Sequence, residues 1–332
     1  MKLSCPDYTF KLSCLAAVGA RRRWQARERG ATLAEKRPML ASRLLFQGHD
    51  TFLCRTNWLK KGYDFIQDGG GFNDADAVVR LGVGKNMVTA IRYWLRAFGL
   101  TDENDLLQPV AHELLGPSGL DPYLEDEATV WYLHYRLVRT GRASLYHFVF
   151  NKLRREGFSF TRAQLAQFVT RRAAELGAPT PNENTLDSDL TMFVRSYAPP
   201  GREQARPDVE EESTGLLQDL GLLTLNRADG LRYHIENLDR PELPWPVVLR
   251  VILENPAFGD VISFTDLAVA SDSPGLVFAL SEKGLFQKLE AMMQRLPAAV
   301  VYSSTAGNRV LTLKREQLDV AAIWQEYYGL LA

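Results

Sequence analysis

The segment Asp76–Leu95, which reads DAVVRLGVGKNMVTAIRYWL, restricts the fold more than any other part of the chain. A short apolar pattern ends at Gly82, and a second pattern begins near Lys85 with apolar residues three or four positions apart. Residues at that spacing share one face of a helix, and two helices joined by a tight glycine turn form a helix-turn-helix. We therefore predict this motif. The core stripe of its second helix is Val88, Ile91, Leu95 and Phe98.

The outer face of the second predicted helix carries cations and small polar side chains but no acid. In helix-turn-helix proteins the first residues of this helix contact base edges and later ones contact phosphates. The same unit can instead mediate protein contacts, and acids flanking the motif would repel phosphate if they shared this face. DNA contact and protein contact therefore both remain open. The candidate DNA-binding residues are Lys85, Asn86, Thr89, Arg92 and Arg96.

Helical patterns surround this motif on both sides. We predict helices over residues 56–67, 73–81 and 85–98, followed by a small β-wing or hairpin over 106–115, where Pro109 interrupts the apolar pattern. The middle of the chain has helical spacing throughout. Its predicted helices cover residues 126–139, 143–155, 161–176 and 184–197.

The last part of the chain has the element order of a winged helix. A short helix over 216–220 and a hairpin over 222–235 come first. Helices near 245–254, 264–270 and 276–296 then precede strands over 299–303 and 309–313. Asn308 and Arg309 lie at the hairpin turn and are candidate wing contacts. The expected core residues of the last helix are Phe278, Leu285, Phe286 and Leu289.

The predicted fold is mainly α, with two winged-helix or helix-turn-helix-like units flanking a helical middle region and short β-hairpins as wings. The segment 198–213 contains three prolines and alternating charge, which is typical of a linker. The predicted parts are a basic extension (1–40), an N-terminal helix-turn-helix domain (41–120), a helical middle region (121–197), the linker (198–213) and a C-terminal winged-helix-like domain (214–332).

Residues 1–40 differ from the rest in charge. They carry a formal charge of +6, although the whole chain carries −1. A short secretory signal around Leu12–Ala20, a basic arm for nucleic acid, and a non-native extension upstream of Met39 are all compatible with this composition. We favour the extension, and we leave residues 1–38 out of the fold prediction.

Catalytic and cofactor motifs are weak in this sequence. His134 and His147 lie in aromatic helical patterns, where a hydrogen-bonded core histidine is the commoner role. The segment Gly82–Lys85 resembles part of a phosphate loop, but the upstream glycine and the following Ser or Thr are missing. We expect no enzyme activity, cofactor or metal. The three cysteines and the lack of a long apolar run favour a cytoplasmic protein with no membrane partner.

Five separated blocks resemble the bacterial domain-of-unknown-function family 4007 (DUF4007) between about Phe46 and Lys314. The blocks are FQGHDTF with Arg55 and WLKK, DAVVRLGVGKNMVTAIRYW, DPYLEDEATVWYLHY, SPGLVFAL and STAGNRVL. Members of this family resemble accessory proteins encoded in DNA phosphorothioation and phage-defence islands. The resemblance therefore implies sulfur-modification or defence proteins as partners, and it implies no catalytic residues.

The first of these blocks also contains a possible secondary polar site, made by His49, Asp50, Arg55, Lys60 and Lys61. We favour a structural role for its first residues, since polar side chains near a helix start commonly bond to the free amides there. The sequence predicts a non-catalytic subunit that binds double-stranded DNA or acts as an adaptor in a DNA-modification or phage-defence system. A protein-only scaffold and a transcriptional regulator of the same gene cluster are the alternatives.

Overall fold

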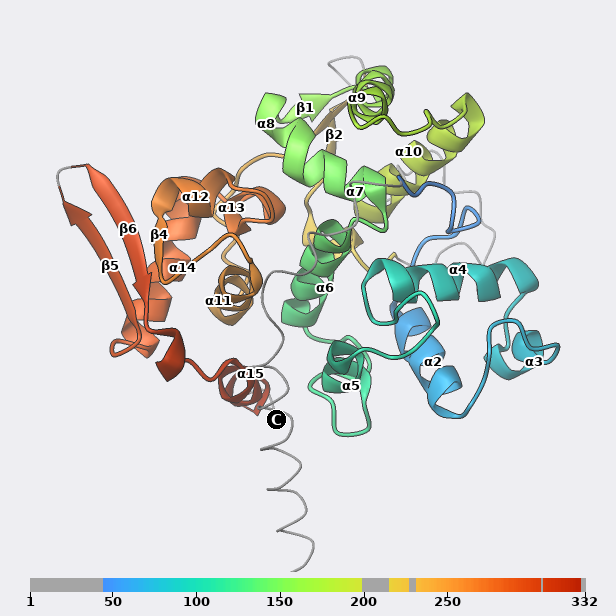
Figure 1. The fold of residues 1–332 in the computed structure, drawn as a ribbon, viewed down its shortest axis with the longest axis horizontal. Coiled ribbons are helices and arrows are strands. Elements are labelled where there is room, and N and C mark those ends of the chain that lie inside the picture. Colours follow the sequence, from blue (N-terminus) through green and yellow to red (C-terminus); the bar gives the residue numbers. More distant parts are fainter. Residues whose placement is uncertain (1–43, 199–214, 227–230, 306, 330–332) are drawn as a thin grey trace, which may run out of the picture. The chain divides into compact units, whose positions relative to one another are not determined.

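The computed structural model describes residues 44–198, 215–226, 231–305 and 307–329 (Figure 1). All of them belong to one structural unit, residues 38–332. The predicted extension over 1–40 and nearly all of the predicted linker over 198–213 lie outside the described residues. The division of the chain into domains remains a prediction.

Four helices follow one another in the first part of the described chain. The third, α4, packs against α2, because Gly62 lets Ile91 and Leu95 approach the α2 backbone; an added Cβ at Gly62 would meet these side chains at less than 3 Å. The predicted helices are therefore confirmed, although α3 begins at Asp76 as its N-cap and not at Asn73. These helices are α2 (Thr56–Gln67), α3 (Ala77–Leu81), α4 (Lys85–Ala97) and α5 (Pro109–Leu115).

The β-wing predicted over residues 106–115 is wrong. Pro109 occupies the first position of helix α5, where its missing N–H is not needed and its fixed φ favours the helix. The chain before α5 forms a tight loop closed by one antiparallel bridge between Thr101 and Leu107. This first part of the fold is therefore helical, without a paired hairpin of its own.

The middle region is helical, as predicted. The predicted helix over 143–155 is divided, because a π-helical turn, η2, separates α7 from α8. Helix α9 has a capping box, in which the Thr161 hydroxyl accepts from the Gln164 amide and the Gln164 side chain accepts from the Thr161 amide. The elements are α6 (Glu127–Thr140), α7 (Ser144–Phe148), η2 (Val149–Leu153), α8 (Arg154–Glu156), α9 (Arg162–Glu175) and α10 (Glu183–Tyr197).

Two small antiparallel sheets complete the fold. The first has the order β1-β3-β2 and pairs Ser159 of the middle region with His234, so it joins two segments far apart in sequence. The second has the order β4-β6-β5 and extends from Val300↔Leu313 to Thr305↔Asn308. The strands are β1 (Ser159–Phe160), β2 (Thr224–Asn226), β3 (Arg232–His234), β4 (Val261–Ser263), β5 (Val300–Thr305) and β6 (Asn308–Leu313).

The predicted helix over 276–296 is two helices, each with its own cap. Ser273 caps α13, and Ser281 caps α14 after Ala279 adopts a left-handed backbone with φ 51°. Strands β1 and β4 were not predicted, and the hairpin of β5 and β6 was. The remaining elements are η3 (Gln218–Leu220), α11 (Trp245–Glu254), α12 (Phe264–Val269), α13 (Pro274–Val277), α14 (Glu282–Arg295), η4 (Arg315–Gln317) and α15 (Val320–Gly329).

Helix α6 lies at the centre of the described fold and packs against both α4 and α11 (Figure 1). Phe278, which leads from α13 towards α14, is fully buried, and its ring meets the edge of Trp131 on α6 at 5.7 Å. Phe286 was also predicted as core, and that prediction is wrong. The Phe286 side chain is 38% exposed and touches the Tyr302 ring at the surface. Because the chain breaks between α13 and α14, the buried face of α14 contains Leu285 and Leu289 but not Phe286.

Truncation of these two phenylalanines should therefore have different costs. Phe278→Ala removes a fully buried ring and should lower the free energy of unfolding by about 3 to 5 kcal/mol. Phe286→Ala is the matched control in the same segment and should cost less than about 1 kcal/mol. Urea-induced unfolding of the full chain measures both, and equal losses would contradict this assignment of the core.

Candidate nucleic-acid interface

The turn between α3 and α4 has the backbone that a helix-turn-helix requires. Gly82 ends α3 in the left-handed region, with φ 62°, and its N–H donates to the Val79 carbonyl at 3.1 Å. Val83 packs partly buried against the core, and Gly84 is the N-cap of α4. The predicted stripe of Val88, Ile91, Leu95 and Phe98 is buried, so the opposite face of α4 is directed outwards.

The N-terminal half of that outer face is open. Lys85, Asn86 and Thr89 are exposed, and the Thr89 hydroxyl makes only a long hydrogen bond of 3.5 Å to the Lys85 carbonyl. Among the described residues, the side chains of Lys85 and Asn86 have neither a hydrogen bond nor an ion pair. Lys85, Asn86 and Thr89 therefore lie together on the surface, where their side chains can contact a ligand.

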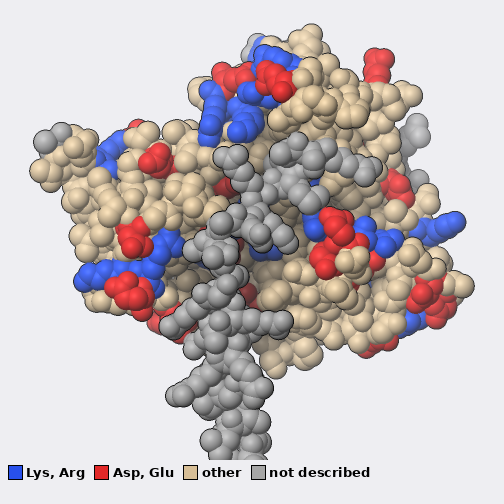
Figure 2. Space-filling model, in the orientation of Figure 1, with Lys and Arg blue, Asp and Glu red and all other residues tan. Residues whose placement is uncertain are grey.

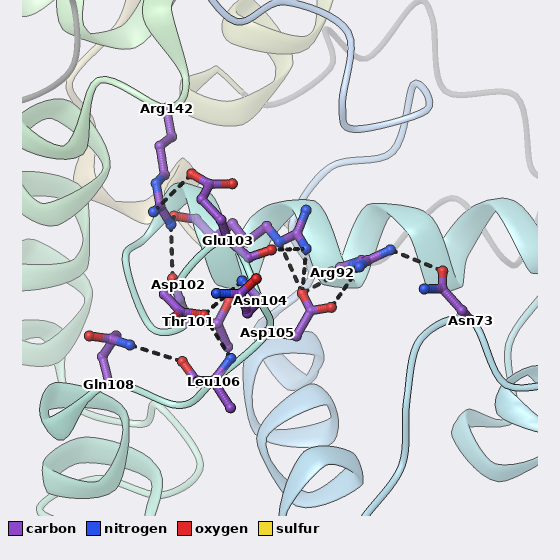
Figure 3. Close-up of polar contacts among 11 residues, drawn as sticks. Asn73, Arg92, Thr101, Asp102, Glu103, Asn104, Asp105, Leu106, Gln108 and Arg142 are labelled. Atoms are coloured by element: carbon purple, nitrogen blue, oxygen red, sulfur yellow. Dashed lines mark hydrogen bonds and ion pairs between the residues drawn. The ribbon is translucent and has the colours of Figure 1, made fainter.

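The C-terminal half of the face is occupied by an acid (Figure 3). Asp105 accepts hydrogen bonds from Arg92 Nε at 3.0 Å and from Arg96 Nε at 2.9 Å, and both arginines also form ion pairs with it. Arg92 donates in addition to Asn73 at 3.1 Å. Helix α4 itself carries no acid, but the chain turns back after it and places the flanking Asp105 over this half of the face.

Hydrogen bonds and an ion pair fix the loop that carries Asp105. The Asp102 carboxylate accepts from the amides of Asn104 and Leu106 at 2.8 and 2.9 Å, and Asp105 itself has a left-handed backbone with φ 62°. Arg142 of the middle region pairs with Glu103 at 3.0 Å and donates to the Thr101 carbonyl (Figure 3). The two arginines of α4 therefore belong to an ordered ion-pair network, which we call the Asp105 latch: Asn73, Arg92, Arg96, Glu103, Asp105 and Arg142.

The five residues of the predicted secondary polar site do not form one site, because they lie in two separate places. His49 is buried, donates from Nε2 to Asp189 on α10 at 2.9 Å, and accepts on Nδ1 from the Thr51 amide. This fixes the chain entering α2 to the middle region. Asp50 is exposed in a left-handed turn, and the Arg55 guanidinium lies over the Trp58 ring at 5.6 Å.

Lys60 and Lys61 instead line a cavity of about 510 Å³ between α2 and α3. Lys60 is paired with Asp64 at 2.5 Å and lies 5.6 Å from the Tyr63 ring. Arg80 of α3 lines the same cavity, donates to the Asp68 carbonyl and lies over the Phe65 ring. Sequence reasoning missed Arg80, since helical spacing alone does not show that α3 turns it towards α2.

The two candidate wing residues have different surroundings. Arg309 pairs with Glu282 at 2.9 Å, and its guanidinium lies 4.1 Å from the Phe264 ring centroid. Asn308 is exposed at the end of the hairpin, opposite Thr305. The structure therefore holds Arg309 against α12 and α14 and leaves Asn308 open to solvent.

Both histidines weighed as catalytic groups are buried. His134 Nε2 donates to the Val277 carbonyl and its Nδ1 accepts from the Tyr197 hydroxyl, each at 2.8 Å, so the neutral ring satisfies both partners. Burial lowers the pKa of His134 to about 3 and also lowers the pKa of His147. Within the described part of the chain, no three His, Cys, Asp or Glu side chains gather as a metal site would require.

The fold defines a helix-rich protein with two small antiparallel sheets among its described residues. A model of the family described as "Protein of unknown function (DUF4007)" matches residues 46–328, so the chain belongs to the DUF4007 family, as the sequence blocks predicted. No curated protein matches the chain. Among the described helices, none is long and apolar enough to cross a bilayer.

Two solved structures resemble the chain over most of its length. An SspB crystal structure is 28% identical, with a TM-score of 0.74 over 86% of this chain and 88% of that chain. A magnesium ion-bound SspB crystal structure is 27% identical, with a TM-score of 0.76 over 88% of this chain and 90% of that chain.

Acidification should destabilise the protein through His134. Its pKa of about 3 in the folded state lies below the ordinary value of 6.5, so the unfolded chain takes up the proton first. The stabilisation is complete above pH 6.5 and is lost as the pH falls towards 3. Below pH 6 the wild type should lose about 1.4 kcal/mol per pH unit more than His134→Gln, in which no group titrates at this position. Urea unfolding at several pH values tests this, and equal slopes would refute it.

Proposed function

We propose that this protein is a DNA-binding or adaptor subunit of a bacterial DNA-modification system of the phosphorothioation type, or of a related phage-defence system, and that α4 contacts duplex DNA. One observation carries the proposal. A five-residue helix and a left-handed glycine turn present α4 with Lys85, Asn86 and Thr89 exposed at its N-terminal end. This is the end of a recognition helix that reads base edges in the major groove.

The three exposed side chains are suited to distinct contacts. Lysine and asparagine donate to acceptors on guanine and adenine in the major groove, and a threonine methyl can contact the thymine methyl. The Asp105 latch leaves Arg92 and Arg96 weaker as phosphate contacts than their charge alone suggests. We therefore assign direct contact first to Lys85, Asn86 and Thr89.

The C-terminal part supports a second unit of related type. Its elements follow the order α11, β4, α12, α13, α14, β5 and β6, with an antiparallel sheet of order β4-β6-β5, and we propose that it is a winged helix. Its hairpin would serve as a wing. Asn308 is the residue available for contact there, since Arg309 is paired within the unit.

We propose a non-catalytic role among sulfur-modification or defence proteins, as the family resemblance implies, and a cytoplasmic location, which the cysteine content favours. A protein-only scaffold or a transcriptional regulator remains the alternative when α4 binds no duplex. One similar structure is magnesium ion-bound, so duplex binding by the full chain should be measured both with Mg²⁺ and with EDTA.

Substitution on α4 should weaken duplex binding without unfolding the protein. Lys85→Ala removes one exposed cation and should reduce the slope of log affinity against log salt by about 0.9. Asn86→Ala should instead change the preference among sequences by about 1 to 3 kcal/mol. Fluorescence-anisotropy titrations of a defined duplex at several salt concentrations measure both. Unchanged curves, or no binding of the wild type at low salt, would refute the DNA-reading role and favour the scaffold.

Opening the Asp105 latch should have the opposite effect on duplex binding. Asp105→Asn removes the carboxylate that holds Arg92 and Arg96, so both guanidinium groups become available to phosphate. The salt slope should become steeper by about 0.9 to 1.8, and affinity at low salt should rise. Asp187→Asn changes the net charge equally on α10 and is the control. An equal rise in both variants would assign the effect to net charge alone.

A further inference from the structure

A second cationic surface lies on the middle region, where η2, α8 and α9 meet. Figure 2 shows Lys and Arg side chains gathered over α8 and α9, with acids among them. Glu156 and Glu175 are acids of α8 and α9, and they form ion pairs with Arg171 and Arg172 at 2.6 to 3.9 Å. The positive charge in excess lies on the preceding segment, at Lys152, Arg154 and Arg155.

The excess charge has few internal partners. Arg154 donates to the Leu276 carbonyl and to Asn237, neither of which is an anion. Lys152 and Arg155 have no hydrogen bond or ion pair among the described residues, and Asp272 is the acid that acts on Lys152 from nearby. Burial, together with the charges of Arg155 and Arg172, lowers the pKa of Lys152. An anion bound here would relieve this mutual repulsion.

A groove next to these cations contains an exposed aromatic ring. Its volume is about 400 Å³, and Arg154, Arg155 and Phe158 line it together with Val269 and Leu276. The Phe158 side chain is 63% exposed, although its backbone is fixed by a 2.8 Å hydrogen bond from the Ile235 amide at the edge of the first sheet. An exposed ring directly before strand β1, beside Arg154 and Arg155, which have no acidic partner in the part of the chain that the structure describes, is suited to stack on a flat, uncharged group.

We propose that this groove binds an unpaired nucleotide of a nucleic-acid strand, with its base on Phe158, one phosphate on Arg155 in the groove, and the next on Lys152, which lies outside the groove lining three residues before Arg155. Single-strand sites combine a positive path for the backbone with aromatic rings on which bases stack. A paired base inside a duplex has no free face to offer to Phe158, so the ligand is single-stranded. The inference concerns a different surface from α4, and it holds whether or not α4 contacts a duplex.

The test separates the base from the phosphate. The full chain is titrated with labelled 12-residue strands of thymidylate, of uridylate and of abasic sugar phosphate, and with a duplex of the same length. Phe158→Ala should weaken thymidylate binding on the order of 10- to 100-fold and leave abasic binding unchanged, whereas Phe158→Tyr should retain the affinity. Arg155→Ala combined with Lys152→Met should weaken both strands and reduce the salt slope by about 1.4.

Lys314→Ala removes one exposed lysine after β6 and is a control for the loss of a surface cation elsewhere, expected to leave single-strand binding unchanged. Stronger binding of thymidylate than of uridylate assigns the site to DNA, and the reverse assigns it to RNA. The proposal is overturned when Phe158→Ala weakens the abasic strand as much as thymidylate, when neither set of variants changes binding, or when the wild type binds no single strand. None of these results bears on Lys85, whose test uses the duplex alone.

Discussion

A single buried guanidinium, that of Arg250 on α11, joins α11 to α5, α6 and α15. It donates two hydrogen bonds to Glu113 on α5, at 2.7 and 2.8 Å, and one to Glu254 at 2.9 Å. Its Cζ atom lies 4.2 Å from the Tyr132 ring centroid and 4.7 Å from that of Trp324. Because a buried charge left unpaired costs several kcal/mol, these five side chains hold their elements in one arrangement.

The pairing of cations with carboxylates also determines which Lys and Arg side chains remain available to bind a ligand. Arg142, Arg250 and Arg309 each have a carboxylate within 3.0 Å, so they fix loops and helices to one another and contribute little to an outer electrostatic field. Lys85, Lys152 and Arg155 have no such partner among the described residues. With a formal charge of −1 for the whole chain, the proposed attraction for nucleic acid would depend on these local sites and not on net charge.

Much of the fold could be predicted from the sequence, because helical spacing depends on neighbours three and four residues apart. Helix α2 follows its predicted bounds, 56–67, for that reason. Strand β1 could not be predicted, since its two residues pair with β3 more than 70 positions away. Pro109 was interpreted as a break, and the same residue is equally suited to begin a helix. For the candidate site, the sequence predicted that α4 presents Lys85, Asn86 and Thr89, but not that Asp105 lies over the arginines of the same face.

The two halves of α4 differ in what a ligand would meet. In the second half, a phosphate must compete with a carboxylate that already makes hydrogen bonds to both Arg92 and Arg96. In the first half, Lys85 lies beside the free amides of the helix N-terminus, where the helix dipole also favours an anion. Both differences act in the same direction. An anionic partner of α4 would therefore gain more by approaching its N-terminal end, because Asp105 already pairs with the two arginines of the other half.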